Sequence, residues 1–226
     1  MKILIVADEE CSALWDYYTP GKLKAYDLIL SGGDLKADYL SFLVTVARCP
    51  LMYVHGNHDS KYLFDPPEGC DDIDGKLVVY KGLRILGLGG SRQYSGGKHQ
   101  YTDRQMRKRI RKLKTAIRLA GGVDIVLSHA APYGVGDAED VAHRGFESFL
   151  ELIDTYHPKY ILHGHMHMNY ATGLVRKGEY HGTQTINCCE RYVLEIEDPE
   201  PKAKPKELLW RIQNLFTKNF EWIDLY

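Results

Sequence analysis

Apolar runs that stop abruptly at polar clusters dominate the pattern of this chain. The run at 51–54 has the length and β-branched content of a buried strand, and it ends in the polar segment 55–59. Further apolar runs end in the same way, before polar residues at 8–10, 31–34, 128–129 and 163–167. Proteins of the α/β class place their sites where strands end. The pattern therefore predicts that these polar residues meet at one edge of the sheets.

The same pattern predicts alternating strands and helices over most of the chain. The predicted strands are 2–7, 27–31, 51–54, 123–128 and 159–163, and the predicted helices are 36–48, 103–120 and 145–156. A hairpin joins 76–81 to 83–88 across Lys81-Gly82. Beyond these elements we expect hairpin strands at 170–176, 179–187 and 192–197, with a turn at Lys177-Gly178. This order predicts an α/β protein with two sheets rather than one.

The C-terminal end differs in composition from the rest of the chain. Segment 198–206 is rich in Pro and Lys, which is typical of a linker. Apolar residues then recur at helical spacing and form one face: Leu208, Leu209, Ile212, Leu215 and Phe216. We expect one domain over 1–197, followed over 198–226 by the linker and a C-terminal helix that packs back on the domain. The alternative is that this helix contacts a second copy, so the chain is a monomer or a homodimer.

Length, charge and cysteine usage narrow the class of protein. The 226 residues suit one domain with a substantial core. A formal net charge of −1 gives no overall attraction for nucleic acid. The N-terminal apolar run is too short for a signal peptide or a membrane span. The five cysteines show no metal-binding spacing, so we expect reduced thiols in a cytoplasmic protein: Cys11, Cys49, Cys70, Cys188 and Cys189.

The polar residues at the strand ends have a definite chemistry. Carboxylates, an amide oxygen and several imidazoles would meet at one edge, and nothing about folding alone requires them there. This donor set suits a site for two divalent metal ions with oxygen and imidazole ligands and no thiolate. For any one of the segments, the alternative is a polar turn with incidental histidines. The repetition of the pattern at several strand ends favours the metal site.

The order of these motifs resembles that of a known family. Asp8, Gly-Gly-Asp ending at Asp34, Gly-Asn-His-Asp starting at Gly56, Ser-His ending at His129 and Gly-His-Met-His starting at Gly164 are similar to the motifs of the calcineurin-like metallophosphoesterases. The resemblance implies a two-sheet β-sandwich flanked by helices (αββα), with the metal site at the C-terminal ends of the strands. One position departs from the family pattern, because Glu10 stands where the family usually has His.

The resemblance also implies a ligand set for two divalent ions. Asp8, Glu10, Asp34 and His167 would hold the first ion, and Asp34, Asn57, His129 and His165 the second. Because side chains alternate along a strand, we expect Asp8 and Glu10 to share a face while Glu9 faces elsewhere. Three carboxylates and one imidazole make a hard set that favours Mn²⁺, with Fe²⁺, Mg²⁺, Ni²⁺ or Zn²⁺ as alternatives.

Catalytic and substrate-binding roles follow from the same resemblance and from two polar loops. His58 would approach the phosphoryl group and protonate the leaving group, and Asp59 would either orient His58 or cap the next turn. The glycine-rich loop 89–101 has the composition of a mobile anion-contacting loop through Arg92, Tyr94 and His99. In the loop 131–145, Arg144 is a candidate phosphate clamp, and a plain surface arginine is the favoured alternative.

Together these features predict a metal-dependent phosphoesterase that acts on a phosphodiester or a small phosphorylated metabolite by direct hydroxide attack. A nuclease is the alternative suggested by the basic outer face of helix 103–120, although a solvated helix face is the favoured interpretation. A catalytically weak metal-binding regulator is a further alternative, supported only by Glu10. We expect a small-molecule phosphate ester as the partner, with no nucleic acid and no membrane.

Overall fold

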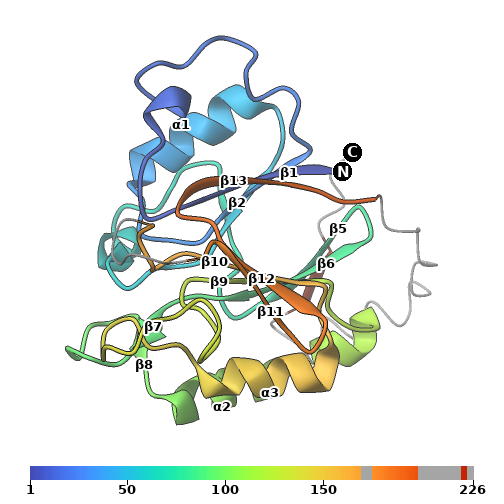
Figure 1. The fold of residues 1–226 in the computed structure, drawn as a ribbon. Coiled ribbons are helices and arrows are strands. Elements are labelled where there is room, and N and C mark those ends of the chain that lie inside the picture. Colours follow the sequence, from blue (N-terminus) through green and yellow to red (C-terminus); the bar gives the residue numbers. More distant parts are fainter. Residues whose placement is uncertain (169–174, 198–219, 223–226) are drawn as a thin grey trace.

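Two stacked sheets with helices on their outer faces build the molecule (Figure 1). The computed structural model describes residues 1–168, 175–197 and 220–222. The five-stranded sheet has the order β13-β1-β2-β3-β4, and the seven-stranded sheet has the order β11-β12-β10-β9-β6-β5-β14. Helix α1 (Ala37–Ala47) covers the first sheet, while α2 (Asp103–Ala120) and α3 (Glu147–Tyr156) cover the second. The predicted αββα sandwich is confirmed.

The strands predicted up to residue 163 have bounds close to the predicted ones, and the short strands β4, β7 and β8 were not predicted. In the first sheet they are β1 Lys2–Ala7, β2 Leu28–Ser31, β3 Leu51–Tyr53, β4 Asp71–Asp72 and β13 Glu190–Glu195. In the second they are β5 Leu77–Tyr80, β6 Leu83–Leu88, β9 Ile125–Ser128, β10 Tyr160–His163, β11 Lys177–Tyr180, β12 Thr183–Asn187 and β14 Phe220–Trp222. The short pair β7 (Ser91–Arg92) and β8 (Gln100–Tyr101) stands apart. Two 3₁₀ turns, η1 (Ser12–Leu14) and η2 (Asp59–Leu63), complete the elements.

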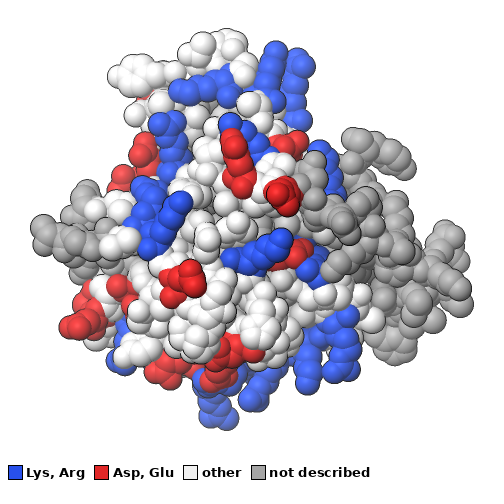
Figure 2. Space-filling model, turned by 45° about the vertical axis from the view of Figure 1, so that its right-hand side comes forward, with Lys and Arg blue, Asp and Glu red and all other residues white. Residues whose placement is uncertain are grey.

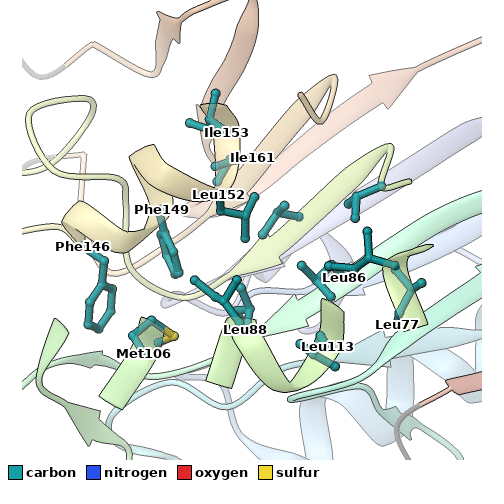
Figure 3. Close-up of a cluster of buried hydrophobic side chains, with 14 of the residues drawn as sticks. Leu77, Leu86, Leu88, Met106, Leu113, Phe146, Phe149, Leu152, Ile153 and Ile161 are labelled. Atoms are coloured by element: carbon teal, nitrogen blue, oxygen red, sulfur yellow. The ribbon is translucent and has the colours of Figure 1, made fainter. Parts of the chain in front are cut away.

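Buried apolar side chains fill each interface between the layers. The continuous apolar run of β1 is explained by burial of the strand on both faces. Ile3 and Ile5 pack between the sheets, while Leu4 and Val6 pack toward α1. A strand buried on both faces has no polar face to alternate with. The third cluster joins α2 and α3 to the second sheet, and Figure 3 shows Phe149 of α3 and Met106 of α2 gathered over Leu88 of β6.

Helix α2 has the bounds that its sequence predicts. The Thr102 hydroxyl accepts a hydrogen bond from the Gln105 amide, and Gln105 Oε1 accepts one from the Thr102 amide, which forms a capping box. Gly121 ends the helix in the left-handed conformation (φ 76°), where glycine carries no steric penalty. The inward stripe is buried and includes Ile110 and Leu113. The helix is therefore defined almost entirely by local signals.

The C-terminal hairpins differ from the prediction. The turn expected at Lys177-Gly178 is wrong, because both residues lie in β11, and the chain reverses at His181-Gly182. Both turn residues have positive φ, 47° and 84°, as a two-residue hairpin turn with the twist of the strands requires. Residues 170–174 of the first predicted strand lie outside the described residues.

The tail past residue 197 is described only at β14, which runs parallel to β5 at the edge of the second sheet. The sequence pattern did not predict this strand. The predicted linker 198–206 and the apolar helical face from Leu208 to Phe216 lie outside the described residues, so the division at residue 197 stays a prediction. In the part of the chain that is described, none of the helices has the length and hydropathy needed to cross a membrane.

Candidate metal centre

The C-terminal ends of parallel strands bring the sequence motifs together. Strands β1, β2 and β3 run parallel in one sheet, and β9 and β10 run parallel in the other. His129, which follows β9, lies at the centre: its Nε2 is 2.9 Å from Asn57 Oδ1 and 3.3 Å from Asp34 Oδ2. Ligand atoms of Asp34, His129 and His165 all lie within 4.8 Å of one another. We refer to Asp34, Asn57, His129 and His165 as the central cluster.

Strained backbone marks the residues that turn into this cluster. Asp8, Asp34 and His165 have φ of 65°, 57° and 67°, in the left-handed region that non-glycine residues rarely adopt. Such conformations cost about 1–3 kcal/mol each and persist where the surroundings enforce them, commonly at functional sites. The consequence here is geometric, because each residue leaves its strand direction and turns its side chain toward the space between the sheet edges.

Two glycines of the motifs are required by close approach. A Cβ on Gly56 would lie 2.0 Å from Asp34 Oδ1, and a Cβ on Gly164 would lie 2.5 Å from Asp8 Oδ2. Either contact is far shorter than any two non-bonded atoms tolerate. The carboxylates of Asp34 and Asp8 therefore occupy the space that the missing side chains leave free.

Asp59 organises the loops of the central cluster. Its Oδ2 accepts hydrogen bonds from the Gly56 amide (2.7 Å) and the Asp34 amide (2.8 Å), and the residue is 4% exposed. The carboxylate thus ties the turn after β2 to the turn after β3. Asp59 therefore positions the cluster, and its predicted roles, orienting His58 or capping the turn that begins at Asp59, stay predictions.

Charges inside the central cluster are strongly coupled. Burial disfavours the charged form of His129, yet the charges of Asp34 and Asp8 outweigh burial and raise its pKa to about 9. Burial opposes ionisation of Asp34 as well, but the charge and hydrogen bond of His129 lower its pKa to about 2. For Asp8, burial dominates and raises the pKa to about 6. The cluster therefore stabilises a positive charge at its centre.

The donors fit a divalent cation. Asp8 Oδ1 accepts a hydrogen bond from the His165 amide at 2.8 Å, whereas Asp8 Oδ2 is buried without a hydrogen-bond partner among the described residues. A buried carboxylate oxygen without a partner is costly. A cation coordinated by Asp8 would satisfy this oxygen and replace the proton that His129 otherwise holds against Asp34. The predicted ligands Asp8, Asp34, Asn57, His129 and His165 are thus brought together at one edge.

The positions of Glu9 and Glu10 are exchanged relative to those that strand alternation predicted. Glu9 Oε1 lies 2.7 Å from His167 Nδ1, so the prediction that Glu9 faces elsewhere is wrong. Glu10 Oε1 accepts from the Lys36 amide at 3.3 Å and lies 3.5 Å from Lys36 Nζ. The strand ends at Ala7, and the left-handed turn at Asp8 breaks the alternation on which the prediction depended. The role of Glu10 as a metal ligand stays a prediction.

His58 faces a pocket next to the central cluster. The pocket holds about 420 Å³ and is lined by His58, Asp34, Glu10 and two lysines, Lys36 and Lys61, among others. The His58 amide donates to Asp34 Oδ1 at 2.8 Å, so the backbone of His58 holds the ligand while its side chain is exposed. The lining also includes the carboxylates of Asp38, Asp59 and Asp65, so an anionic group would depend on bound cations as well as on the imidazole and the lysines.

The four predicted substrate-binding residues occupy different surroundings. Tyr94 Oη accepts a hydrogen bond from Asn57 Nδ2 at 3.2 Å, which places Tyr94 at the central cluster. Arg92 donates to the Gly145 carbonyl at 3.3 Å, and Arg144 lies over the ring of Tyr133 and donates to its hydroxyl at 3.3 Å. His99 is 9% exposed and stacks on His55 with ring centroids 4.6 Å apart, unlike the mobile anion contact that the loop composition predicted.

Comparison with known proteins agrees with this geometry. The family model for calcineurin-like phosphoesterase matches residues 1–169. The chain belongs to this family. A lariat debranching enzyme of Caenorhabditis briggsae is 28% identical over 171 residues, covering 56% of this chain and 33% of that protein. The chain therefore spans about a third of the length of that relative.

Solved structures share the fold at low identity. One has a TM-score of 0.60 at 12% identity, covering 85% of this chain and 94% of the other. The structure of TT1561 of Thermus thermophilus has a TM-score of 0.55 at 16% identity, covering 84% of this chain and 89% of the other. Such likeness shows the fold alone. The family model and the debranching-enzyme relative place the chain among phosphoesterases, a family that typically binds divalent metals.

Sequence reasoning gave no role to several residues that this phosphoesterase places at the edge. The Ala142 carbonyl lies 2.8 Å from His165 Nε2, and the His143 and His165 rings are 5.1 Å apart. Cys189 lies with Glu9 and His167, with ligand atoms of the three within 4.8 Å of one another. Loop 131–145 was predicted as a possible substrate loop, but no local motif signalled the contacts of Ala142 and His143 with His165 or the position of Cys189.

Proposed function

We propose that this phosphoesterase hydrolyses a small phosphate ester, either a phosphodiester or a phosphorylated metabolite, at two divalent cations bound along the strand-end edge. The observation that carries the proposal is the buried donor set around His129, together with the unpartnered oxygen of Asp8 among the described residues. The central cluster would hold one cation, and Asp8, Asp34 and His167 would contribute to the other, with Asp34 between them. In the central cluster the oxygen donors of Asp34 and Asn57 suit Mn²⁺, and the imidazoles of His129 and His165 also suit Fe²⁺, Ni²⁺ or Zn²⁺.

The residues of the chain position and neutralise the substrate. A pair of cations would lower the pKa of a shared water toward neutrality and so supply the attacking hydroxide. Lys36 and Lys61 line the pocket and would neutralise phosphoryl oxygens as charge builds up on them. His58 would donate a proton to the leaving oxygen from the open side of the same pocket. Tyr94 holds the Asn57 amide by a hydrogen bond and keeps its carbonyl oxygen directed at His129.

The pocket supports a small substrate over a nucleic acid. Its volume of about 420 Å³ lies within the range of small-molecule sites, about 300–1,000 Å³. The basic helix α2 belongs to the outer layer, and Arg107 is bound to Glu151 Oε1 at 2.6 Å and to Asp103 at 2.8 Å. On the face shown in Figure 2, lysines and arginines lie among aspartates and glutamates. A nuclease would be expected to present an unpaired basic surface leading to the metals.

A substrate panel tests the proposal. Metal-free protein is loaded with Mn²⁺, Mg²⁺, Fe²⁺, Ni²⁺ or Zn²⁺ and assayed with phosphomonoesters, phosphodiesters, nucleotides and oligonucleotides. We expect turnover of at least one small ester, and loss of that turnover in His129→Gln. Cleavage confined to oligonucleotides would favour the nuclease. Tight metal binding without turnover of any ester would favour a regulatory metal-binding protein.

A further inference from the structure

A second group of metal-binding atoms lies beside the central cluster. The carboxylate of Glu9, the imidazole of His167 and the thiol of Cys189 each offer a ligand atom, and these atoms lie within 4.8 Å of one another. Glu9 and His167 are half-exposed, at 46% and 45%, whereas Cys189 is 2% exposed. The group combines three different donors from three separate segments, which come after β1, after β10 and between β12 and β13.

The backbone holds Cys189 in this position through several contacts. Cys189 pairs with Ala7 in an isolated parallel bridge, one residue before Asp8. Its amide donates to Asn187 Oδ1 at 2.9 Å, while Asn187 Nδ2 donates to the Met166 carbonyl at 2.6 Å. One buried amide side chain thus connects the strand end that carries Cys189 to the loop that carries His167. The proximity of the two side chains is therefore built into the fold.

The oxygen of Asp8 that is unpartnered among the described residues belongs to the residue that directly follows the strand end bridged to Cys189. The Asp8 side chain is 1% exposed, and its Oδ2 has no hydrogen-bond partner among the described residues. The bridge between Ala7 and Cys189 brings the segment of Cys189 alongside the end of β1, one residue before Asp8. A carboxylate oxygen buried without a partner beside a Glu–His–Cys group calls for a positive ion.

Glu10, the residue that replaces the family histidine, lies elsewhere. It accepts a hydrogen bond from the Lys36 amide and lies near Lys36 Nζ, on the side of the pocket that contains His58. Glu9 instead lies 2.7 Å from the ring nitrogen of His167. The structure thus offers Glu9 and Cys189, two residues outside the motifs, as donors where a motif histidine is missing.

The geometry points to a divalent transition-metal site formed by Glu9, His167 and Cys189, with the free oxygen of Asp8 completing the ligands toward the central cluster. On binding, the Cys189 thiol proton leaves to solvent, so that the metal is held by thiolate, imidazole and carboxylate. Small rotations of the half-exposed Glu9 and His167 would bring the donors to bond lengths of about 2.0–2.3 Å. A thiolate makes the site softer, so it favours Zn²⁺, Co²⁺ or Fe²⁺ over Mn²⁺ and Mg²⁺.

This inference deepens the proposed function, since it assigns the ligands of one of its two cations, but its test needs no turnover. Metal-free full-length protein is titrated with Co²⁺, and the thiolate-to-cobalt charge-transfer absorption in the near ultraviolet is recorded together with the bound stoichiometry. We expect the band in the wild type, its loss in Cys189→Ser, and its retention in Cys188→Ser. Cys188 is the matched control because it is equally buried and its Sγ contacts the Ile186 carbonyl.

A second pair of variants tests the carboxylate of Glu9, and it leaves the buried residue Cys189 unchanged. Glu9→Gln should weaken binding of the ion that gives the thiolate band by at least about tenfold, whereas Glu10→Gln should leave it unchanged. Circular dichroism and the melting temperature confirm that each variant is folded. Absence of the band in the wild type, its persistence in Cys189→Ser, or a larger effect of Glu10→Gln than of Glu9→Gln would overturn the assignment.

The outcome is separable from that of the proposed function. A thiolate band in a protein that turns over no phosphate ester would retain this metal site and reject the hydrolase mechanism. Turnover of a phosphate ester by a protein without the thiolate band would support the hydrolase and reject this metal site. If Cys189→Ser does not fold, the comparison of Glu9→Gln with Glu10→Gln still decides the assignment.

Discussion

The strand-end edge and the outer face of α2 are both rich in charge, yet their charges are arranged in opposite ways. At the edge, Asp8, Asp34 and His129 are buried and act on one another across 3.3–4.0 Å. On α2, Arg104, Lys108, Arg111, Lys112, Lys114 and Arg118 are exposed, while Arg107 and Arg109 are bound to carboxylates. Exposed charges are screened by water and salt, whereas buried ones perturb each other strongly. Burial and convergence, more than the density of charge, indicate where the chemistry occurs.

The largest effect is expected from His58→Ala. The side chain is exposed and lines the pocket, so its loss should leave metal binding intact while turnover falls by about 10²–10⁴-fold, as for the loss of a general acid. Steady-state kinetics and metal analysis of the purified variant measure both properties. His181→Ala, at an exposed hairpin turn, is the control and should retain wild-type turnover. A variant at His58 with normal kinetics would remove this residue from the mechanism.

Burial of His163 at the strand-end edge should make the stability of the protein depend on pH. Burial lowers the pKa of His163 from 6.5 to about 4. As the pH falls below about 6.5, the unfolded chain binds a proton that the folded protein refuses until about pH 4, so stability is lost across this window. For one group the loss approaches about 3 kcal/mol, roughly two orders of magnitude in the folding constant.

Denaturant titrations of the metal-free protein from neutral pH to about pH 4 measure this loss. In His163→Gln the slope of stability against pH should become shallower in the same window, because the proton uptake of the unfolded chain is removed. A slope equal to that of the wild type would assign the acid sensitivity to other groups.

A smaller effect is expected where a buried carboxylate only positions the ligands. Asp59→Asn keeps the shape but loses the charge that accepts from the Gly56 and Asp34 amides, so Asp34 and Asn57 should be held less well. Such supporting interactions typically contribute about 10–100-fold in metal affinity or activity. Metal titration and kinetics would measure the loss, with Asp16→Asn, an exposed residue, as the control. Equal behaviour of both variants would contradict the role given to Asp59.

The least effect is expected on α2. Reversing the exposed Arg111 and Lys114 to Glu should leave turnover of a small ester unchanged, because these residues lie in the outer layer. We expect no measurable binding of oligonucleotides at about 150 mM salt, where exposed charges are well screened. Tight binding that weakens steeply with salt and disappears in this double variant would instead make α2 a nucleic-acid surface. That result would mean that the exposed charges of α2, like the buried charges of the strand-end edge, serve a function.

The elements with strong local signals could be predicted from sequence. Helix α2 was predicted at 103–120 from its apolar stripe and from the glycines that follow it, and the structure adds the Thr102–Gln105 capping box, another local signal. Strand β1 was predicted from a continuous apolar run that is buried on both faces, and β6 was predicted as one arm of the hairpin across Lys81-Gly82. The turn at His181-Gly182 was missed, because a histidine with positive φ carries little signal and Lys177-Gly178 looked equally suitable.

For the site, the sequence by itself determined which donors stand at the ends of the strands, because each motif directly follows an apolar run. Only the tertiary structure decided which of them meet. Alternation along β1 gave Glu10 and not Glu9, since it assumed a strand that in fact ends at Ala7, before the left-handed turn at Asp8. Cys189 reaches Glu9 and His167 through pairing with Ala7 and the side chain of Asn187, which are contacts between segments far apart in the chain. Such contacts depend on how the two sheets stack, and no local pattern of residues encodes that.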